Sequence, residues 1–437
     1  MKQIFAAAFC IVSAATSLQG QPVWSGNSSE VIRVEAMAAS GLEGVYVLDG
    51  TDGVSVSCQT SPTEASAVKW YRYSSLGGGY AEELTDVRID GANSVLTKVE
   101  SDMGYIIEFP DGRKECFWVI DYARHPFSLT SITPSAERDC QRIGLDVIGM
   151  GEEMTYYGIN GRRFVLDREI RLSYRTLTPD DEAVVFTQTE TETTFQALSP
   201  VLHVAAPLCA TEFTLEGDRF LRVWGRAEQL SSTTVEPYAV SAVTKITQSV
   251  RNSDNEVVSD PSGASFGGSA PCELEFEASV TDGALFHEWQ FSRFPDFDDV
   301  SMRMQELSFT YTFNDEGATY LRFVCANADG SCEYMGDVYT VSIGASMLKC
   351  PNAFSPNGDG VNDEWKVSYS SLISFECHIF DRYGRKMADL SEPSQGWDGK
   401  YKGKTVPAGA YFYVIKAKGA DGKVYELSGD INIVHYK

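Results

Sequence analysis

The residues of this sequence that could take part in catalysis lie far apart along the chain. Ser265 stands in GASFG, which matches the G-x-S-x-G pattern of a serine nucleophile. That pattern needs a strand, a sharp turn and a helix, whereas this stretch continues as GSAPCELEF, which predicts a strand. The histidines stand alone at 125, 203, 287, 378 and 435, without a second His or a Cys at zinc-ligand spacing. The sequence therefore predicts a protein without catalytic residues or cofactors, and not an enzyme.

Neighbouring carboxylates are the other candidates for chemistry. They occur at Glu152 and Glu153, at Asp180 and Asp181, and at Asp298 and Asp299. A glycosidase needs two carboxylates on the same side of a bond, but adjacent residues of a strand point to opposite faces. We expect these pairs to lie in solvated loops. The alternative that stays open is a secreted hydrolase whose site is built from loops within residues 21–250.

Length and charge limit the class of protein. A chain of 437 residues exceeds the roughly 250 to 300 residues that one hydrophobic core organises, so several domains are expected. The 61 acidic residues outnumber the 36 basic ones, and a net charge of -25 repels phosphate backbones. We therefore expect no nucleic acid partner. No apolar run after the first twenty residues is long enough to span a bilayer, which predicts a mature chain without a transmembrane segment.

The first twenty residues, MKQIFAAAFCIVSAATSLQG, have the layout of a secretory signal peptide. One cation, Lys2, precedes an apolar stretch that ends in small residues, and we expect cleavage near Gly20. An exported chain meets an oxidising environment in which disulfides persist. Loss of Cys10 with the signal leaves nine of the ten cysteines, so at least one thiol has no partner.

Short strands and tight turns dominate the rest of the chain. Asp-Gly and Asn-Gly pairs, which suit hairpin turns, recur between alternating runs such as YIIEF and YFYVIKA. This pattern predicts an all-β protein of tandem β-sandwiches. We expect an immunoglobulin-like unit at 21–125, a sandwich of unknown type at 126–250, another immunoglobulin-like unit at 251–345 and a terminal sandwich at 346–437. The Ser, Gly and Asp-rich stretch 252–270 is predicted to be a linker or loop between the second and third units.

Two units resemble known modules. In the first, Cys58 precedes Trp70 in VKWYRY by twelve residues, as in immunoglobulin-like sandwiches, where a Trp packs against an inter-sheet disulfide. The resemblance implies a bond between Cys58 and Cys116. The third unit, with Trp289 in FHEWQFS, resembles modules of the polycystic-kidney-disease type found in bacterial surface proteins.

Spacing suggests the remaining pairs of the first three units. Cys325 and Cys332 flank the hairpin ANADGS, and a disulfide needs Cα atoms within roughly 7 Å, so we expect these two to bond. Cys272 should lie at the opposite end of that sandwich and stay a free thiol. Cys140 and Cys209 are the two cysteines of the second unit and form the candidate pair there.

The last ninety residues carry a series of motifs in a fixed order. PNAFSPNGDGVNDEWKV is followed by HIFDRYGRKM, by GWDGKYKGKTVPAGAYFYV and by GDINIVHYK. In order and spacing this region resembles the gliding-motility-associated C-terminal domain, the type-B sorting domain of cargo of the type IX secretion system in Bacteroidota. The resemblance assigns the following residues to the sorting motif: Pro351, Asn352, Phe354, Pro356, Asn357, Gly358, Asp359, Gly360, Asn362, Asp363, Trp365, Tyr383, Gly384, Trp397, Asp398 and Gly399.

The resemblance also implies a function. Such a domain directs export through the type IX machinery, and a PorP-like outer-membrane β-barrel is the implied partner. The protein would be secreted or attached to the cell surface, where its immunoglobulin-like modules would bind another surface protein or a glycan, as in adhesion. Cys350 and Cys377 both fall in this domain, which suggests a disulfide between them.

The loop from Pro351 to Trp365 should be rigid. Its prolines fix φ, and its glycines allow backbone angles that other residues avoid. A weak calcium candidate overlaps it, because Ser355, Asn357, Asp359 and Asp363 follow the alternate spacing of an EF-hand loop. Lys366 stands where such a loop needs a bidentate Glu. For Trp397 we expect a structural role at the end of the sandwich, with contact to the secretion machinery as the alternative.

Overall fold

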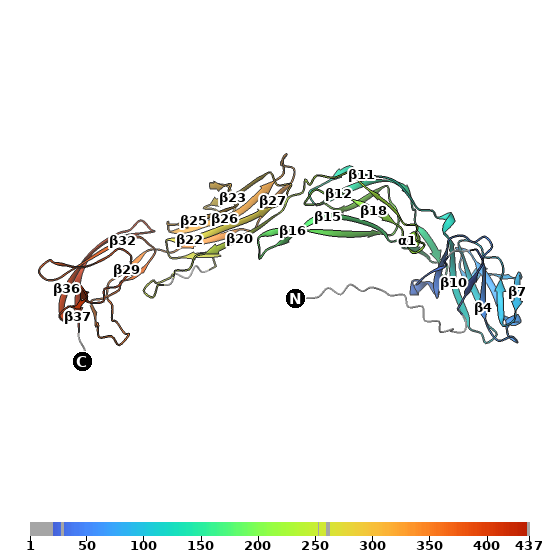
Figure 1. Ribbon diagram of the computed structural model, residues 1–437, viewed down its shortest axis with the longest axis horizontal. Coiled ribbons are helices and arrows are strands. Elements are labelled where there is room, and N and C mark those ends of the chain that lie inside the picture. Colours follow the sequence, from blue (N-terminus) through green and yellow to red (C-terminus); the bar gives the residue numbers. More distant parts are fainter. Residues whose placement is uncertain (1–20, 28–29, 252, 259–262, 435–437) are drawn as a thin grey trace.

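The computed structural model describes residues 21–27, 30–251, 253–258 and 263–434. The β-sandwich units follow one another along an elongated, arched molecule, with the first unit and the terminal domain at opposite ends (Figure 1). Helical structure in the described residues is limited to α1 (Arg219–Val223) and four 3-10 turns, η1 (Ala38–Ser40), η2 (Ala65–Ala67), η3 (Gly78–Tyr80) and η4 (Tyr122–Arg124). The prediction of an all-β chain of tandem sandwiches is confirmed.

The first unit consists of two sheets. One has the order β1-β4-β8-β7 and the other β2-β3-β10-β9-β5-β6, in which β3 and β10 run parallel. Its strands are β1 (Val23–Ser25), β2 (Ile32–Val34), β3 (Gly44–Leu48), β4 (Ser55–Gln59), β5 (Lys69–Tyr73), β6 (Glu82–Leu84), β7 (Val87–Asp90), β8 (Asn93–Leu96), β9 (Met103–Glu108) and β10 (Lys114–Asp121).

Trp70 lies in the core between these sheets, as the immunoglobulin-like pattern predicts. It is fully buried, and its indole Nε1 donates to Ser94 Oγ at 3.0 Å. The predicted bond between Cys58 and Cys116 is absent, and both are free thiols. Alternation along β10 explains the error: Cys58 packs in the core around Trp70, whereas Cys116 points from the opposite face of its sheet into the cluster shared with the second unit.

The second unit contains three sheets, with the orders β11-β12-β17, β13-β14 and β16-β15-β18-β19. Its strands are β11 (Ser128–Arg138), β12 (Arg142–Met150), β13 (Met154–Tyr157), β14 (Arg163–Leu166), β15 (Ile170–Asp180), β16 (Val185–Phe195), β17 (Val201–Ala205), β18 (Thr214–Gly217) and β19 (Glu228–Ser231).

The first and second units share one hydrophobic cluster that extends from Leu42 to Val235. Hydrogen bonds accompany this apolar contact. Tyr73 Oη donates to the carbonyl of Tyr157 at 2.9 Å, and Trp224 Nε1 donates to the carbonyl of Glu30 at 2.8 Å. Since both units bury side chains in the same cluster, the junction between them is packed like a domain interior.

The third unit begins earlier than the sequence suggests. Its sheets have the orders β20-β22-β25 and β21-β28-β26-β23-β24, and β27 pairs with β26. Its strands are β20 (Ala242–Gln248), β21 (Phe266–Gly268), β22 (Cys272–Val280), β23 (Phe286–Ser292), β24 (Val300–Met304), β25 (Ser308–Phe313), β26 (Gly317–Ala326), β27 (Glu333–Met335) and β28 (Tyr339–Ile343). Because β20 pairs with β22, the described part of 252–270 lies inside this unit, and the predicted linker between the second and third units is wrong.

One disulfide, Cys140 to Cys332, joins the second and third units, with the two Cα atoms 5.4 Å apart. The predicted pairs Cys140 with Cys209 and Cys325 with Cys332 are therefore wrong. Cys325 points into the core of the third unit and pairs in register with Tyr334, and Cys209 is buried in the second unit. Both stay free, as Cys272 does.

Polar contacts surround this disulfide. The hydroxyl of Tyr238 donates to the carbonyl of Arg142 at 2.7 Å and also to that of Asp139. The guanidinium of Arg138 lies 4.5 Å from the centre of the Tyr238 ring, and Asn327 Nδ2 donates to the carbonyl of Tyr238 at 3.2 Å. The junction between the second and third units is thus fixed by a covalent bond and by the contacts of Tyr238 with residues of both units.

The terminal domain is a smaller sandwich. Its main sheet has the order β30-β37-β36-β32-β33, and β29-β31 and β34-β35 form two-stranded sheets. Its strands are β29 (Met347–Lys349), β30 (Ala353–Phe354), β31 (Ser368–Ser370), β32 (Leu372–Phe380), β33 (Lys386–Leu390), β34 (Lys400–Tyr401), β35 (Lys404–Thr405), β36 (Gly409–Gly419) and β37 (Val424–Ile433). No helix among the described residues has the length and apolar character needed to cross a membrane.

Residues 253–258 of the third unit lie on the terminal domain. Val257 N donates to Tyr369 O at 2.7 Å, and Tyr369 N donates to Asn255 O at 3.2 Å, so this stretch runs beside β31. The side-chain amide of Asn255 donates to the carbonyls of Val367 and Pro393 at 2.7 and 2.8 Å. Residues 253–258, whose composition predicts a linker, therefore fix the junction between the third unit and the terminal domain.

Candidate functional site: the loops of the terminal domain

The loop between Pro351 and Trp365 is held by its own polar side chains. Both carboxylate oxygens of Asp363 accept backbone N–H groups, from Gly358 at 2.6 Å and from Gly360 at 2.7 Å. These two donors lower the pKa of Asp363. Gly358 and Gly360 have φ of 79° and 85°, which a residue with a Cβ adopts only with strain. The loop is thus shaped by local hydrogen bonds and by two glycines.

Three of the calcium candidate residues, Asn357, Asp359 and Asp363, use their side-chain oxygens within the loop. Asp359 Oδ1 accepts from Val361 N at 2.8 Å, and Asn357 Oδ1 accepts from Asp359 N at 3.1 Å. With both oxygens of Asp363 also occupied by N–H groups, these side chains face the loop backbone. In the described part of the chain, no three or more His, Cys, Asp and Glu side chains are grouped so that they could hold a metal ion.

Two tryptophans fasten this loop to the rest of the domain. Trp365 and Trp397 form a β-bridge with reciprocal backbone hydrogen bonds of 2.9 and 3.0 Å, and both side chains are buried. Trp365 Nε1 donates to the carbonyl of Pro351 at 2.7 Å, which closes the loop. The ring of Trp397 lies 5.1 Å from that of Tyr411 on β36. Trp397 is therefore a core residue.

The turn after Trp397 adjoins the loop. Gly399 has φ of 70°, and a Cβ on it would lie only 3.0 Å from Cγ of Pro356. Lys400 forms a 2.6 Å ion pair with Asp398, and this hydrogen bond lowers the pKa of Asp398. The structure therefore brings together the loop and the Trp-Asp-Gly turn, which are about forty residues apart in the sorting motif.

The DRYG turn lies beside strand β34, since the guanidinium of Arg385 is 5.8 Å from the centre of the Tyr401 ring. Asp381 Oδ1 accepts from the backbone N–H groups of Tyr383 and Arg385, both at 2.9 Å. This arrangement leaves the Tyr383 side chain 75% exposed. Beside the turn lies a cavity of about 450 Å³, which we call the basic groove. It is lined by Asp381, Arg382, Tyr383, Arg385, Met387, Tyr401 and residues 404–411.

Cys350 and Cys377 pack in the same hydrophobic core, but no bond joins them in the structure. Burial, and to a smaller extent the neighbouring Cys350, raises the pKa of Cys377 to about 12. Such a thiol is protonated at neutral pH and reacts slowly. The predicted disulfide is not formed in the structure, and the two side chains act as small apolar core residues.

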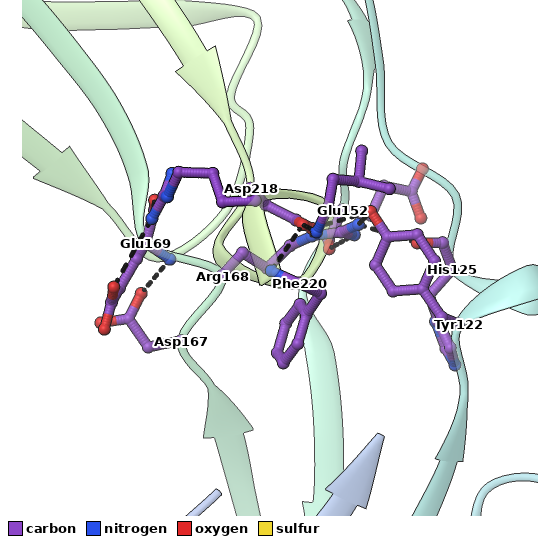
Figure 2. A network of polar contacts seen from close by, with 10 residues as sticks. Tyr122, His125, Glu152, Asp167, Arg168, Glu169, Asp218 and Phe220 are labelled. Atoms are coloured by element: carbon purple, nitrogen blue, oxygen red, sulfur yellow. Dashed lines mark hydrogen bonds and ion pairs between the residues drawn. The ribbon is translucent and has the colours of Figure 1, made fainter. Parts of the chain in front are cut away.

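A buried polar network that the sequence did not predict lies between the first two units. Arg168 and Asp218, both fully buried, form a 2.8 Å ion pair, and Asp218 also accepts the hydroxyl of Tyr122 at 3.0 Å (Figure 2). Arg168 further donates to the carbonyls of Glu152 and His125 at 3.0 and 2.8 Å. Asp218 also caps α1 through the N–H groups of its first residues. Nothing in the surrounding sequence distinguishes this arginine from the surface arginines nearby.

A cleft of about 420 Å³ lies beside this network. His125 and Ser199 are among the residues that line it, and His125 Nε2 lies 2.9 Å from Oδ1 of Asp102. No hydrogen bond joins Ser199 to His125 among the described residues. Ser265 is far from forming a nucleophile elbow, since it directly precedes strand β21.

A larger cavity, about 680 Å³, lies on the third unit. Its floor includes Gln290 and Arg322, which are joined by a 2.8 Å hydrogen bond. Leu285, Phe286 and Met335 at its margin are each more than 60% exposed. This surface combines exposed apolar side chains with ordered polar ones, as ligand sites do.

Two protein-family models agree with this organisation. The family model described as the CHU_C type IX secretion signal domain matches residues 348–431, and the fibronectin type III domain model matches residues 132–232. No curated protein matches the chain in sequence. Solved structures that match include a tetra-tandem repeat in the extending region of a large adhesion protein (12% identity, 88% of this chain and 96% of that chain, TM-score 0.21). Another is dimeric latent PorU from Porphyromonas gingivalis (11% identity, 74% of this chain and 35% of that chain, TM-score 0.16).

Residues 348–431 form a type IX secretion signal domain, and a fibronectin type III domain precedes it at 132–232. The predicted resemblance of the C-terminal region is confirmed. The second unit, whose type the sequence did not disclose, is thereby assigned to the immunoglobulin-like class. A signal domain of this kind marks the chain for export out of the cell, with the type IX secretion machinery as its partner.

Proposed function

We propose that this chain is a non-catalytic protein of the cell surface, exported by the type IX system, that presents its immunoglobulin-like units as one stiff rod. The observation that carries the proposal is the construction of the three junctions. The first two units share a hydrophobic cluster, Cys140 and Cys332 link the second to the third, and residues 253–258 lie on the terminal domain. Stiff spacing of this kind serves a binding surface that must be held away from the cell.

The binding partner is proposed at the level of class. A surface protein or a glycan fits an immunoglobulin-like unit, and the cavity beside Phe286 on the third unit is the surface we would test first. A PorP-like outer-membrane β-barrel is the proposed contact of the terminal domain. Adhesion is the role that follows from these assignments.

Deletion of residues 346–437 tests the export part of the proposal. In a native strain that depends on the type IX route, the truncated chain should stay inside the cell, and the full chain should reach the surface or the medium. Immunoblots of cell, surface and medium fractions measure this. Export of the truncated chain at the level of the full chain would show that the terminal domain is not the export signal.

A hydrolase remains the second candidate because His125, paired with Asp102, lines the same cleft as Ser199. A fluorophosphonate probe labels an activated serine, so labelling of the full chain that is lost in Ser199→Ala would favour this candidate. We expect no labelling, because no base hydrogen-bonds to the Ser199 hydroxyl in the part of the chain that the structure describes. Thr187→Ala, a change on the exposed strand β16, serves as the matched control.

A further inference from the structure

The basic groove is flanked by cations that form no ion pair among the described residues, in a protein that is otherwise acidic. The residues before 346 contain 50 acidic and 24 basic side chains, whereas residues 346–437 contain 11 and 12. Arg382, Lys402 and Lys404 are exposed beside the groove, and in the described part of the chain none of them forms an ion pair. Three unneutralised cations at one place create a local positive potential that attracts carboxylates.

Aromatic rings hold these cations in place. Lys402 Nζ lies 5.4 Å from the centre of the Tyr401 ring, and the guanidinium of Arg382 lies 4.9 Å from that of Tyr383. Contacts of this kind restrain long side chains while their charged groups stay in water. The groove therefore presents charge and flat apolar surface together, a combination that protein interfaces favour.

The floor of the groove is an open strand edge. Strand β32 ends at Phe380, opposite Phe412 of β36, so residues 409–411 of β36 pair on one side only, with β37. The space above Gly409 is empty, since a Cβ built there meets no atom within 4 Å. An unpaired strand edge accepts another extended backbone through main-chain hydrogen bonds.

We propose that the basic groove binds an extended acidic segment of a protein of the secretion machinery, which adds to the edge of β36 and places carboxylates against Arg382, Lys402 and Lys404. This inference rests on the proposed export function and names the surface and the chemistry of the partner. The strand edge favours a polypeptide over a lipid surface, because a peptide backbone supplies the N–H and C=O groups that an edge can pair with.

A binding experiment tests the groove directly. The full mature chain is titrated with a fluorescein-labelled hexaglutamate peptide, and fluorescence anisotropy gives the affinity. The variant Arg382→Glu, Lys402→Glu and Lys404→Glu should bind at least tenfold more weakly. The control variant Lys349→Glu, Lys418→Glu and Lys423→Glu makes the same change of charge on exposed residues outside the groove and should bind within threefold of the native chain. Circular dichroism confirms that both variants are folded.

Three results would overturn the proposal. Equal loss of binding in the two variants would make the effect one of net charge alone. If the native chain does not bind the peptide but binds phosphatidylglycerol vesicles through the same cations, the partner is a membrane. Self-association of the native chain, lost in the groove variant and measured by sedimentation velocity, would make a second copy the occupant.

Export assays separate this inference from the proposed function. If the deletion of 346–437 blocks export and the groove variant is also retained, with the control exported, both stand. If the deletion blocks export but the groove variant leaves the cell as well as the control does, the groove inference is wrong and the export function stands. If the deleted chain is exported, the proposed function itself is wrong.

Discussion

Replacing Arg168 with Met tests whether the buried network stabilises the junction of the first two units. The change leaves the Asp218 carboxylate without a counter-charge at a fully buried position. Breaking a buried ion pair in this way costs about 3 to 5 kcal/mol. Tyr122 and the carbonyls of His125 and Glu152 lose a donor as well, and the penalty for leaving these buried groups unsatisfied is part of that range.

The assay is differential scanning calorimetry of the full mature chain. Several units unfold in one molecule, so the transition of the first two units must be followed by itself. For a body of about 200 residues, 1 kcal/mol shifts Tm by about 2 to 4 °C, so Arg168→Met should lower that transition by roughly 6 to 20 °C. Arg163→Met removes an exposed ion pair with Glu153, worth about 0 to 1 kcal/mol, and should lower the same transition by about 4 °C at most.

A double variant identifies the cause. Arg168→Met with Asp218→Asn removes both charges but keeps a side-chain oxygen that can cap α1, so it should be more stable than Arg168→Met alone. If Arg168→Met unfolds at the same temperature as Arg163→Met, the buried charge contributes nothing. If the single and double variants lose the same amount, packing rather than charge explains the loss.

Three further predictions concern other parts of the chain. Titration of the denatured mature protein with a thiol reagent should find seven thiols, since one bond uses Cys140 and Cys332; five or fewer would mean that a second disulfide forms. Burial raises the pKa of Glu115 to about 7, so the folded state holds this proton more tightly than the unfolded state does, and the stability of the first unit should fall as pH rises from about 4.5 to 7. Glu115→Gln should reduce this dependence in urea titrations at several pH values, and an unchanged slope would contradict the assignment. Asn255→Ala removes two hydrogen bonds to the terminal domain, at a cost of about 1 to 3 kcal/mol, and should speed hydrogen exchange in β31, whereas the exposed Ser391→Ala should not.

The features that depend on local sequence could be predicted. Alternating strands and Asp-Gly turns indicate an all-β chain because side-chain periodicity and turn chemistry act within a few residues. The sorting motif could be found for the same reason: Gly358, Gly360 and Asp363 shape their own loop. The burial of Trp70 followed from its place in an immunoglobulin-like strand.

The features that depend on how the units contact one another could not be predicted from the sequence. Cys332 bonds to a cysteine 192 residues away, and a spacing argument within one unit has no access to that contact. Arg168 is one of several arginines in a strand-rich region, and only the fold buries it against Asp218. The stretch around Asn255 has the composition of a linker, yet its amide and backbone groups are satisfied by a neighbouring domain.

The Cys140 to Cys332 bond has a mechanical consequence for a molecule held at one end and pulled at the other. Tension applied between the two ends passes from residue 140 directly to residue 332, so the polypeptide between them carries no load. With 192 residues of separation and about 3.4 Å of extended chain for each, roughly 650 Å of contour cannot be drawn out while the bond is intact. Under shear, the fibronectin type III domain would therefore extend little. In a reducing environment the bond would be lost, and the same tension could extend the molecule much further.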